Sequence, residues 1–316
     1  MNGNHFRPKG RMTLRIIGTA LALGLLVYLL FRQGWGEISA VIGQISLEVF
    51  LLVILMTVLS RTAVGGRWHV LLRSAGVDIS LHKSVSLTFA GLFASNFLPT
   101  TIGGDVVRLA GVLRLNLNRP VCIASLVVDR LVGMVAMATV LPFIAPGLAR
   151  GLSSTAKAPL LAGAPVLSNL DLPSGGKVKK LWEKVGGMLH RLFSALSFWI
   201  KHPRSLLVSL LLSWVHMLLL FGTLWILLRT MGEPQPLWLI AGMWSLTYFV
   251  TLLPVSINGL GVQELSMTFL FTQIGGVAEP TALTLAFLIR ILQMFASLPG
   301  AFYLPDVLAG RDSLSA

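Results

Sequence analysis

Three acidic residues lie inside otherwise apolar stretches, and these are the residue types that could do chemistry there: Asp105, Asp129 and Glu264. Placing each in a bilayer costs at least about 2–3 kcal/mol, so a partner or a function must offset that cost. Arginines stand in similar surroundings: Arg108, Arg130 and Arg290. Carboxylates and guanidiniums in such surroundings pair with one another or bind charged ligands.

Spacing limits which of these groups can pair along the chain. Arg108 follows Asp105 by three residues and shares its helix face, so an i,i+3 pair is expected. Arg130 adjoins Asp129 but points elsewhere on a helix, so Asp129 needs a partner from another segment. Two interpretations stay open: buried ion pairs that fix helix register, or a ligand-binding site.

Other polar residues in the apolar stretches extend the candidate site. Arg290, in the middle of the last stretch, is the candidate to meet Glu264 or a lipid phosphate. Asn96 precedes a helix break and either caps freed backbone or binds a ligand, whereas His216 reads as a satisfied core histidine. The candidate substrate-binding residues are Asn96, Asp105, Arg108, Asp129, Arg130, Asn258, Glu264 and Arg290.

The segments that carry these residues are apolar enough to have lipid as their solvent. Charged residues make up 12% of the 316 residues and hydrophobic residues 55%, against about 25% charged in a soluble domain. The net charge of +13 comes from basic residues that flank apolar runs, which favours a positive-inside bias over nucleic-acid binding. We therefore expect an all-α, polytopic membrane helical bundle, a single transmembrane domain over residues 1–316.

The apolar runs suggest a topology in a bacterial inner membrane. Residues 14–31 are expected to form an uncleaved first span with a cytoplasmic N-terminus, and a last span covers 281–304. A second span begins near Leu47 and runs into a basic cytoplasmic stretch, which holds Arg61, Arg67, His69, Arg73 and Lys83. Residues 177–201 predict a basic amphipathic helix, lying on the membrane surface or packed on the protein's own spans.

Two apolar segments are interrupted by proline and glycine. The break residues are Pro99, Gly103 and Gly104 in one and Pro254, Gly259 and Gly261 in the other. The segment before the first break is too short to cross the bilayer comfortably, and the second break divides an apolar segment in a similar way, which predicts two re-entrant helical hairpins. Amides freed at a half-helix N-terminus suit an anionic group such as phosphate.

The two breaks belong to an internal repeat. Leu71–Gly76 matches Leu227–Gly232, and a Leu-Pro-x-x-Ile pattern follows each after similar spacing. The approximate halves are 47–119 and 204–276. Positive-inside reasoning places Arg73 inside and Arg229 outside, which makes the repeat inverted if 150–176 returns across the membrane. Interrupted segments at matching positions of two halves are typical of secondary transporters.

No enzyme signature is present. The chain lacks G-x-S-x-G, HExxH and Walker motifs. Its single cysteine, Cys122, excludes an intrachain disulfide and CxxC chemistry and reads as a small buried hydrophobe. No cofactor and no metal are expected.

Several motifs together resemble the lysylphosphatidylglycerol synthase transmembrane region, also called flippase-like domain proteins, over roughly residues 10–305. The motifs are Arg67-Trp68, Asn96-Phe97-Leu98-Pro99, Gly103-Gly104-Asp105 with Arg108, Asp129-Arg130, and Pro254 with Gly259-x-Gly261-x-x-Glu264. The resemblance implies a multi-spanning bundle that handles lipids. Asp129 stands where the family more often has Glu, and the soluble aminoacyltransferase domain of full-length synthases is absent from this sequence.

The expected function is flippase-like transport of an anionic or aminoacylated phospholipid, or of a polyprenyl-phosphate-linked lipid. Membrane lipids with anionic headgroups are the expected partners. An alternative is a membrane subunit that assists a separate glycosyl- or aminoacyl-transferase on a lipid carrier. A purely structural assembly factor would leave the intramembrane acids unexplained.

Overall fold

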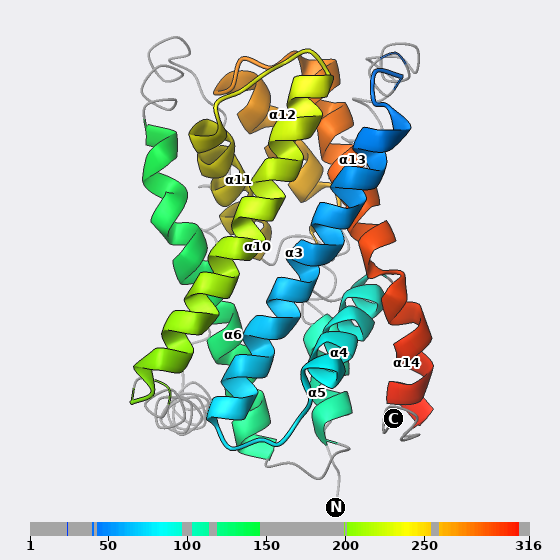
Figure 1. The fold of residues 1–316 in the computed structure, drawn as a ribbon. Coiled ribbons are helices and arrows are strands. Elements are labelled where there is room, and N and C mark those ends of the chain that lie inside the picture. Colours follow the sequence, from blue (N-terminus) through cyan, green and yellow to red (C-terminus); the bar gives the residue numbers. More distant parts are fainter. Residues whose placement is uncertain are drawn as a thin grey trace, which may run out of the picture.

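The computed structural model describes residues 24, 40, 43–96, 103–113, 119–145, 199, 201–253 and 259–309. Every element in these ranges is helical, as Figure 1 shows. The elements are α3 (Leu47–Ser74), α4 (Leu81–Ser95), α5 (Gly103–Leu113), α6 (Arg119–Val140), η1 (Leu141–Ile144), α10 (Pro203–Thr230), α11 (Leu237–Leu252), α12 (Val262–Gln273), α13 (Glu279–Ser297) and α14 (Pro299–Ala309).

Four of the described helices are long and apolar enough to cross a membrane: Leu47–Ser74, Pro120–Ile144, Pro203–Thr230 and Glu279–Ser297. Large apolar side chains on the two longest helices face outward, with Leu55 54% and Leu218 62% exposed. Lipid is the environment in which such a surface is stable. The predicted all-α membrane bundle is therefore confirmed.

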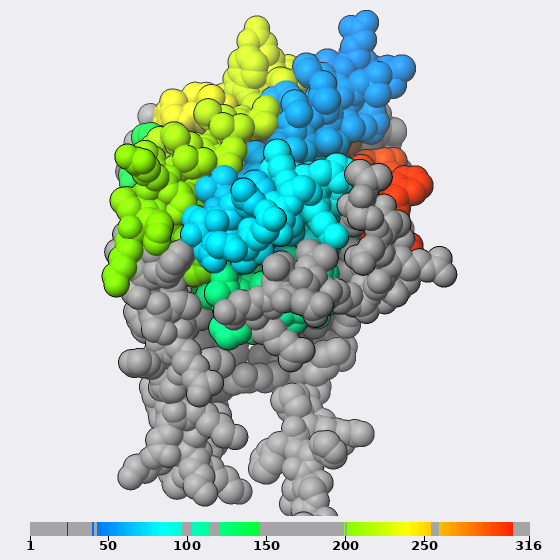
Figure 2. All heavy atoms as spheres, turned by 60° about the horizontal axis from the view of Figure 1, so that its bottom comes forward, coloured from blue at the N-terminus to red at the C-terminus, as the bar shows by residue number. Residues whose placement is uncertain are grey.

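Helices α3 and α10 run antiparallel and side by side (Figures 1 and 2). Both have 28 residues, and 156 positions separate their first residues and also their last. Both end in the same way, at Gly76 (φ 77°) and Gly232 (φ 80°). In each, the residue after the glycine donates its amide to the carbonyl that lies four residues before the glycine. These hydrogen bonds are Val77 to Leu72 and Glu233 to Leu228. This is the Schellman pattern, which needs a left-handed residue.

The contacts between α3 and α10 follow the same offset. Ser60 Oγ lies 2.6 Å from His216 Nδ1, and these two residues are 156 positions apart, so each contacts its own counterpart. In two further contacts, a side chain of one helix lies against a glycine of the other: Met56 against Gly222, and Leu212 against Gly66. Adding 156 to the residues of α3 in one contact gives the residues of α10 in the other. The helix pair is thus packed with the same contacts in both directions.

A pair of short helices follows each of these long helices. In Figure 1, α4 and α5 lie at the lower end of the bundle and α11 and α12 at the upper end. Helix α4 ends at Ser95 and α5 begins at Gly103, while α11 ends at Leu252 and α12 begins at Val262. Helices α4 and α5 touch through glycines, because a Cβ on Gly91 would lie 2.6 Å from the Gly104 carbonyl oxygen.

The predicted last span is wrong as a single helix. Helix α13 ends at Ser297 and α14 begins at Pro299, whose nitrogen has no hydrogen to continue the α13 ladder. Helix α14 then packs against α4. Gly300 permits this, since a Cβ there would lie 2.0 Å from the Phe89 carbonyl oxygen.

Several predictions lie outside the described residues. They concern the first span at 14–31, the cytoplasmic N-terminus, the course of 150–176 and the amphipathic helix at 177–201, of which Trp199 and Lys201 alone are described. Pro99, Pro254 and Asn258 also lie outside them.

Candidate substrate-binding site

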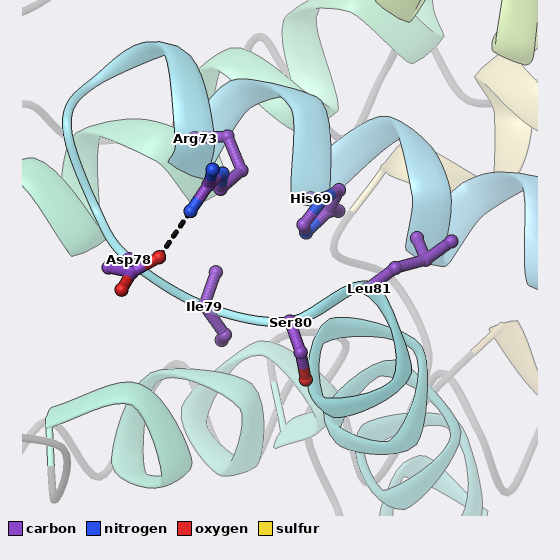
Figure 3. A pocket seen from close by; sticks show the side chains of 6 residues that line it. All are labelled: His69, Arg73, Asp78, Ile79, Ser80 and Leu81. Carbon is purple, nitrogen blue, oxygen red and sulfur yellow. Dashed lines mark hydrogen bonds and ion pairs between the residues drawn. The ribbon is translucent and has the colours of Figure 1, made fainter.

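A cavity of about 820 Å³ lies between the two pairs of short helices. Its wall draws residues from α3, α4, α5, α6, α10, α11, α12 and α13. Among the described residues, four arginines and one carboxylate line it: Arg61, Arg108, Arg130, Arg290 and Asp105. Its lining is therefore net positive. A separate shallow hollow at the α3–α4 turn is lined by six residues that include Arg73 and Asp78, which form an ion pair there (Figure 3).

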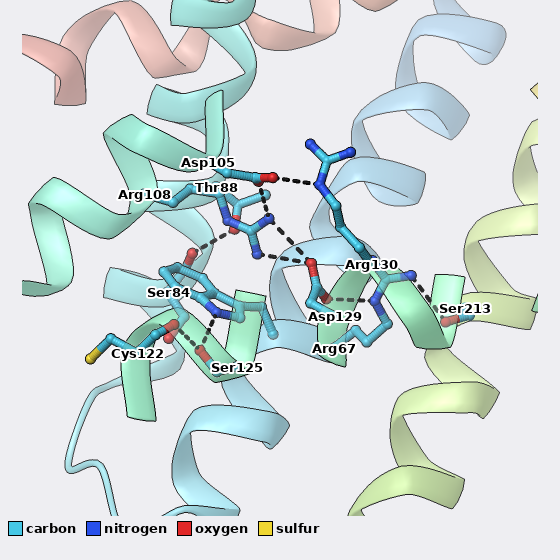
Figure 4. Close-up of polar contacts among 11 residues, drawn as sticks. Arg67, Ser84, Thr88, Asp105, Arg108, Cys122, Ser125, Asp129, Arg130 and Ser213 are labelled. Atoms are coloured by element: carbon cyan, nitrogen blue, oxygen red, sulfur yellow. Dashed lines mark hydrogen bonds and ion pairs between the residues drawn. The ribbon is translucent and has the colours of Figure 1, made fainter. Parts of the chain in front are cut away.

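Asp129 is the most deeply buried acid of the site, with 1% of its surface exposed. One carboxylate oxygen accepts from Arg67 Nε at 2.7 Å and the other from Arg108 Nη2 at 3.1 Å (Figure 4). Arg67 comes from α3 and Arg108 from α5, so the prediction that Asp129 needs a partner from another segment is confirmed.

Asp105 also lies between two arginines. It accepts from Arg108 Nη1 at 3.2 Å, the predicted i,i+3 pair, and from Arg130 Nε at 2.5 Å. The side chains thus form a continuous row of alternating charge, Arg67–Asp129–Arg108–Asp105–Arg130, which we call the ion-pair chain (Figure 4). It ends at the cavity with Arg130, whose side chain is 44% exposed.

Neighbouring side chains hold the ion-pair chain in place. The guanidinium of Arg108 lies 4.2 Å from the centre of the Trp68 ring, a cation–π contact. Trp68 Nε1 donates to Ser125 Oγ at 3.1 Å, and Arg67 Nη1 donates to Ser213 Oγ at the same distance. Helices α3, α5, α6 and α10 are therefore joined through one polar cluster.

Arg61 and Arg67, predicted to lie in a basic stretch that follows the second span, lie inside helix α3. This helix continues to Ser74 and is long and apolar enough to cross a membrane, and Arg67 is only 7% exposed. The sequence does not mark these two arginines as site residues, because they stand in one run of basic residues with His69, Arg73 and Lys83. The signal was helical phase: Arg67 shares a buried stripe with Ser60, Ala63 and Leu71, at spacings of three and four.

A second ion pair stands at the start of α12. Arg290 Nε donates to Glu264 Oε1 at 2.5 Å, so the predicted pairing is confirmed. Glu264 Oε2 accepts from the amide of Gly261 at 2.8 Å, and Arg290 Nη2 donates to the Gly259 carbonyl at 3.3 Å. An amide at this break was expected to bind an anionic ligand. The Gly261 amide instead donates to the protein's own Glu264 carboxylate.

Arg61 differs from the other cavity arginines. It lies in the middle of α3, partly buried, and has no carboxylate partner among the described residues. Arg290, which has the same charge, also lines the cavity. Asn96 completes the wall, where its Nδ2 donates to Ser297 Oγ at 2.8 Å and joins the end of α4 to the end of α13.

An apolar helical bundle with a charged cavity between short helices is suited to handling polar groups inside a membrane. The family model for the lysylphosphatidylglycerol synthase TM region matches residues 15–300. The chain belongs to this family, which supports a membrane location and a function related to membrane lipids. No curated protein matches the chain.

Proposed function

We propose that the protein is a flippase-like transporter that moves a phosphate-bearing lipid across the bacterial inner membrane. The substrate class is an anionic or aminoacylated phospholipid, or a lipid linked to polyprenyl phosphate. The observation that carries the proposal is the cavity of about 820 Å³, which four arginines line inside a bundle whose outer surface is apolar. A guanidinium that faces such a cavity is suited to a phosphate.

The lipid tails need not enter the cavity. Three apolar residues of its lining are themselves well exposed: Val106 57%, Ile123 47% and Leu252 38%. They lie on α5, α6 and α11. We infer that the headgroup enters the cavity at this side while the tails remain in the bilayer.

Access from the two membrane faces follows from an inverted repeat. Helices α3 and α10 make the same contacts in both directions, and the short-helix pairs lie at opposite ends of the bundle (Figure 1). These features favour two halves related by a pseudo-two-fold axis in the membrane plane. In this proposal α4–α5 and α11–α12 are hairpins that open the cavity toward opposite faces.

Asp105 and Glu264 would act as internal counter-anions. Each neutralises an arginine of the cavity wall, Asp105 with Arg130 and Glu264 with Arg290. A lipid phosphate would compete with these carboxylates for the guanidiniums. Asn96 and Asn258 are proposed to contribute polar contacts to the headgroup.

The test measures lipid movement across the membrane of liposomes. The readout is the accessibility of a fluorescent acyl-labelled phospholipid to dithionite. Arg61→Gln is the informative variant because, in the part of the chain that the structure describes, no carboxylate loses its partner. We expect it to slow movement about tenfold or more, from the loss of a charge-assisted contact to phosphate. Arg204→Gln, at an exposed site outside the cavity, is the matched control and should retain wild-type movement.

Movement by wild-type protein that survives Arg61→Gln unchanged would contradict this cavity as the path. If no lipid moves, including polyprenyl phosphate, the transport assignment is wrong. A module that assists a separate transferase would then be the better account.

A further inference from the structure

We infer that the cavity selects its lipid by the sign of the headgroup charge. It takes an anionic phosphate headgroup, discriminates against one that carries an added cationic amino acid, and uses Arg61 as the determinant. This inference rests on the proposed function and names the substrate class of the same site. The contacts of the carboxylates, the position of Arg61 and the charge of the cavity lining carry it.

The carboxylates of the site are already engaged. Asp129 accepts from two arginines, and so does Asp105. Glu264 accepts from Arg290 and from the Gly261 amide. An ammonium group on a lipid would have to displace a guanidinium from one of these acids. Among the described residues, each of these three carboxylates therefore already has a hydrogen-bonded arginine, and none is left to bind a cationic headgroup without displacing one.

Arg61 presents the opposite situation. Arg61 lines the cavity without a carboxylate partner among the described residues, and Arg290, which has the same charge, lines it too. A cation that has no carboxylate partner among the described residues is costly within a helix that can cross a membrane. A bound anion would remove that cost.

Adding lysine to a phosphatidylglycerol headgroup changes its charge from about −1 to about +1, because two ammonium groups accompany one phosphate. In a partly dehydrated cavity with excess arginine, those ammoniums are repelled more strongly than they would be in water. The phosphate of the same lipid gains no compensating contact. The lining therefore favours phosphatidylglycerol or a polyprenyl phosphate over a lysylated lipid.

The decisive experiment measures lipid binding to the full chain in detergent by native mass spectrometry. Three probes are compared: phosphatidylglycerol, lysyl-phosphatidylglycerol with the same acyl chains, and a polyprenyl phosphate. We expect an anionic probe to bind about tenfold or more tightly than the lysylated one, the scale of one charge-assisted contact. The two anionic probes then show whether a phosphodiester or a phosphomonoester is preferred.

Variants of Arg61 assign the preference to this residue. Arg61→Gln should lower the affinity for the anionic probe and bring the two affinities within about threefold of each other, because it removes the unpaired charge. Arg61→Lys keeps the charge and should retain much of the preference. Arg204→Gln should bind as wild type does, and unfolding temperatures in detergent check that each variant is folded.

Equal or tighter binding of the lysylated lipid by wild type would overturn the inference, as would a preference unchanged in Arg61→Gln. Failure of the proposed function looks different. In that case the binding preference is present and sensitive to Arg61, but no lipid moves in liposomes.

Discussion

At the scale of single residues, Asp129 has the central place in the site. It is the acid that accepts from Arg67 and from Arg108, so two buried guanidiniums depend on it. Removing one member of a buried ion pair lowers stability by more than the pair itself contributes, because it leaves an uncompensated charge away from water.

We therefore expect Asp129→Asn to destabilise the protein by about 3 kcal/mol or more, as for a broken buried pair. Thermal or denaturant unfolding in detergent measures the effect. The matched control is Asp78→Asn, which breaks the Arg73–Asp78 pair, whose side chains are 53% and 96% exposed. That variant should change stability by less than about 1 kcal/mol because solvent screens the pair. Equal losses in the two variants would contradict the ranking.

At the scale of elements, the close packing of α4 on α5 rests on glycine. A Cβ on Gly91 would lie 2.6 Å from the Gly104 carbonyl oxygen and 2.9 Å from Arg108 Cγ. The same packing positions Arg108 and Asp105, because both lie on α5. A side chain at residue 91 would therefore disturb the ion-pair chain as well as the helix contact.

We predict that Gly91→Ala lowers stability by about 1–3 kcal/mol, the range for overpacking. Gly66→Ala is the control, because it makes the same change inside helix α3, where a Cβ would meet Leu212 at an ordinary 3.8 Å. Alanine is also the better helix former by up to about 1 kcal/mol, so Gly66→Ala should be neutral or stabilising. Thermal unfolding compares the two; a tolerated Gly91→Ala would show that α4 and α5 can separate freely.

At the scale of the whole molecule, the antiparallel packing of α3 and α10 determines which loops share a membrane face. The α3–α4 turn and the start of α10 lie at one end of the bundle, and the α10–α11 turn lies at the other (Figure 1). The exposed residues Asp78, Lys201 and Pro234 mark these three places.

Single cysteines at these positions test the arrangement in intact cells and in inverted vesicles with a membrane-impermeant thiol reagent. Asp78→Cys and Lys201→Cys should label from the same side, and Pro234→Cys from the opposite side. The background is Cys122→Ser, although Cys122 is itself 0% exposed. Labelling of all three from one side would contradict both the inverted repeat and the proposed access from two faces.

The sequence determined the helical elements and the residues that could carry charge. Proline and glycine in the sequence marked the places where α4 gives way to α5 and α11 gives way to α12. Spacing alone gave the Asp105–Arg108 pair, since i,i+3 neighbours on a helix must meet. The Arg290–Glu264 pair was predicted because each group needed an opposite charge within an apolar segment.

The tertiary structure decided which long-range partners meet. The rotation of α3 against α5, α6 and α10 decides that Arg67 reaches Asp129. It also decides that Arg61 lines the cavity without a carboxylate partner among the described residues. Basic residues read in sequence order look like one cytoplasmic run, because local charge says nothing about helix phase relative to neighbours. Side-chain packing among helices distant in sequence sets that phase, and it thereby determines which arginines meet an acid and which line the cavity.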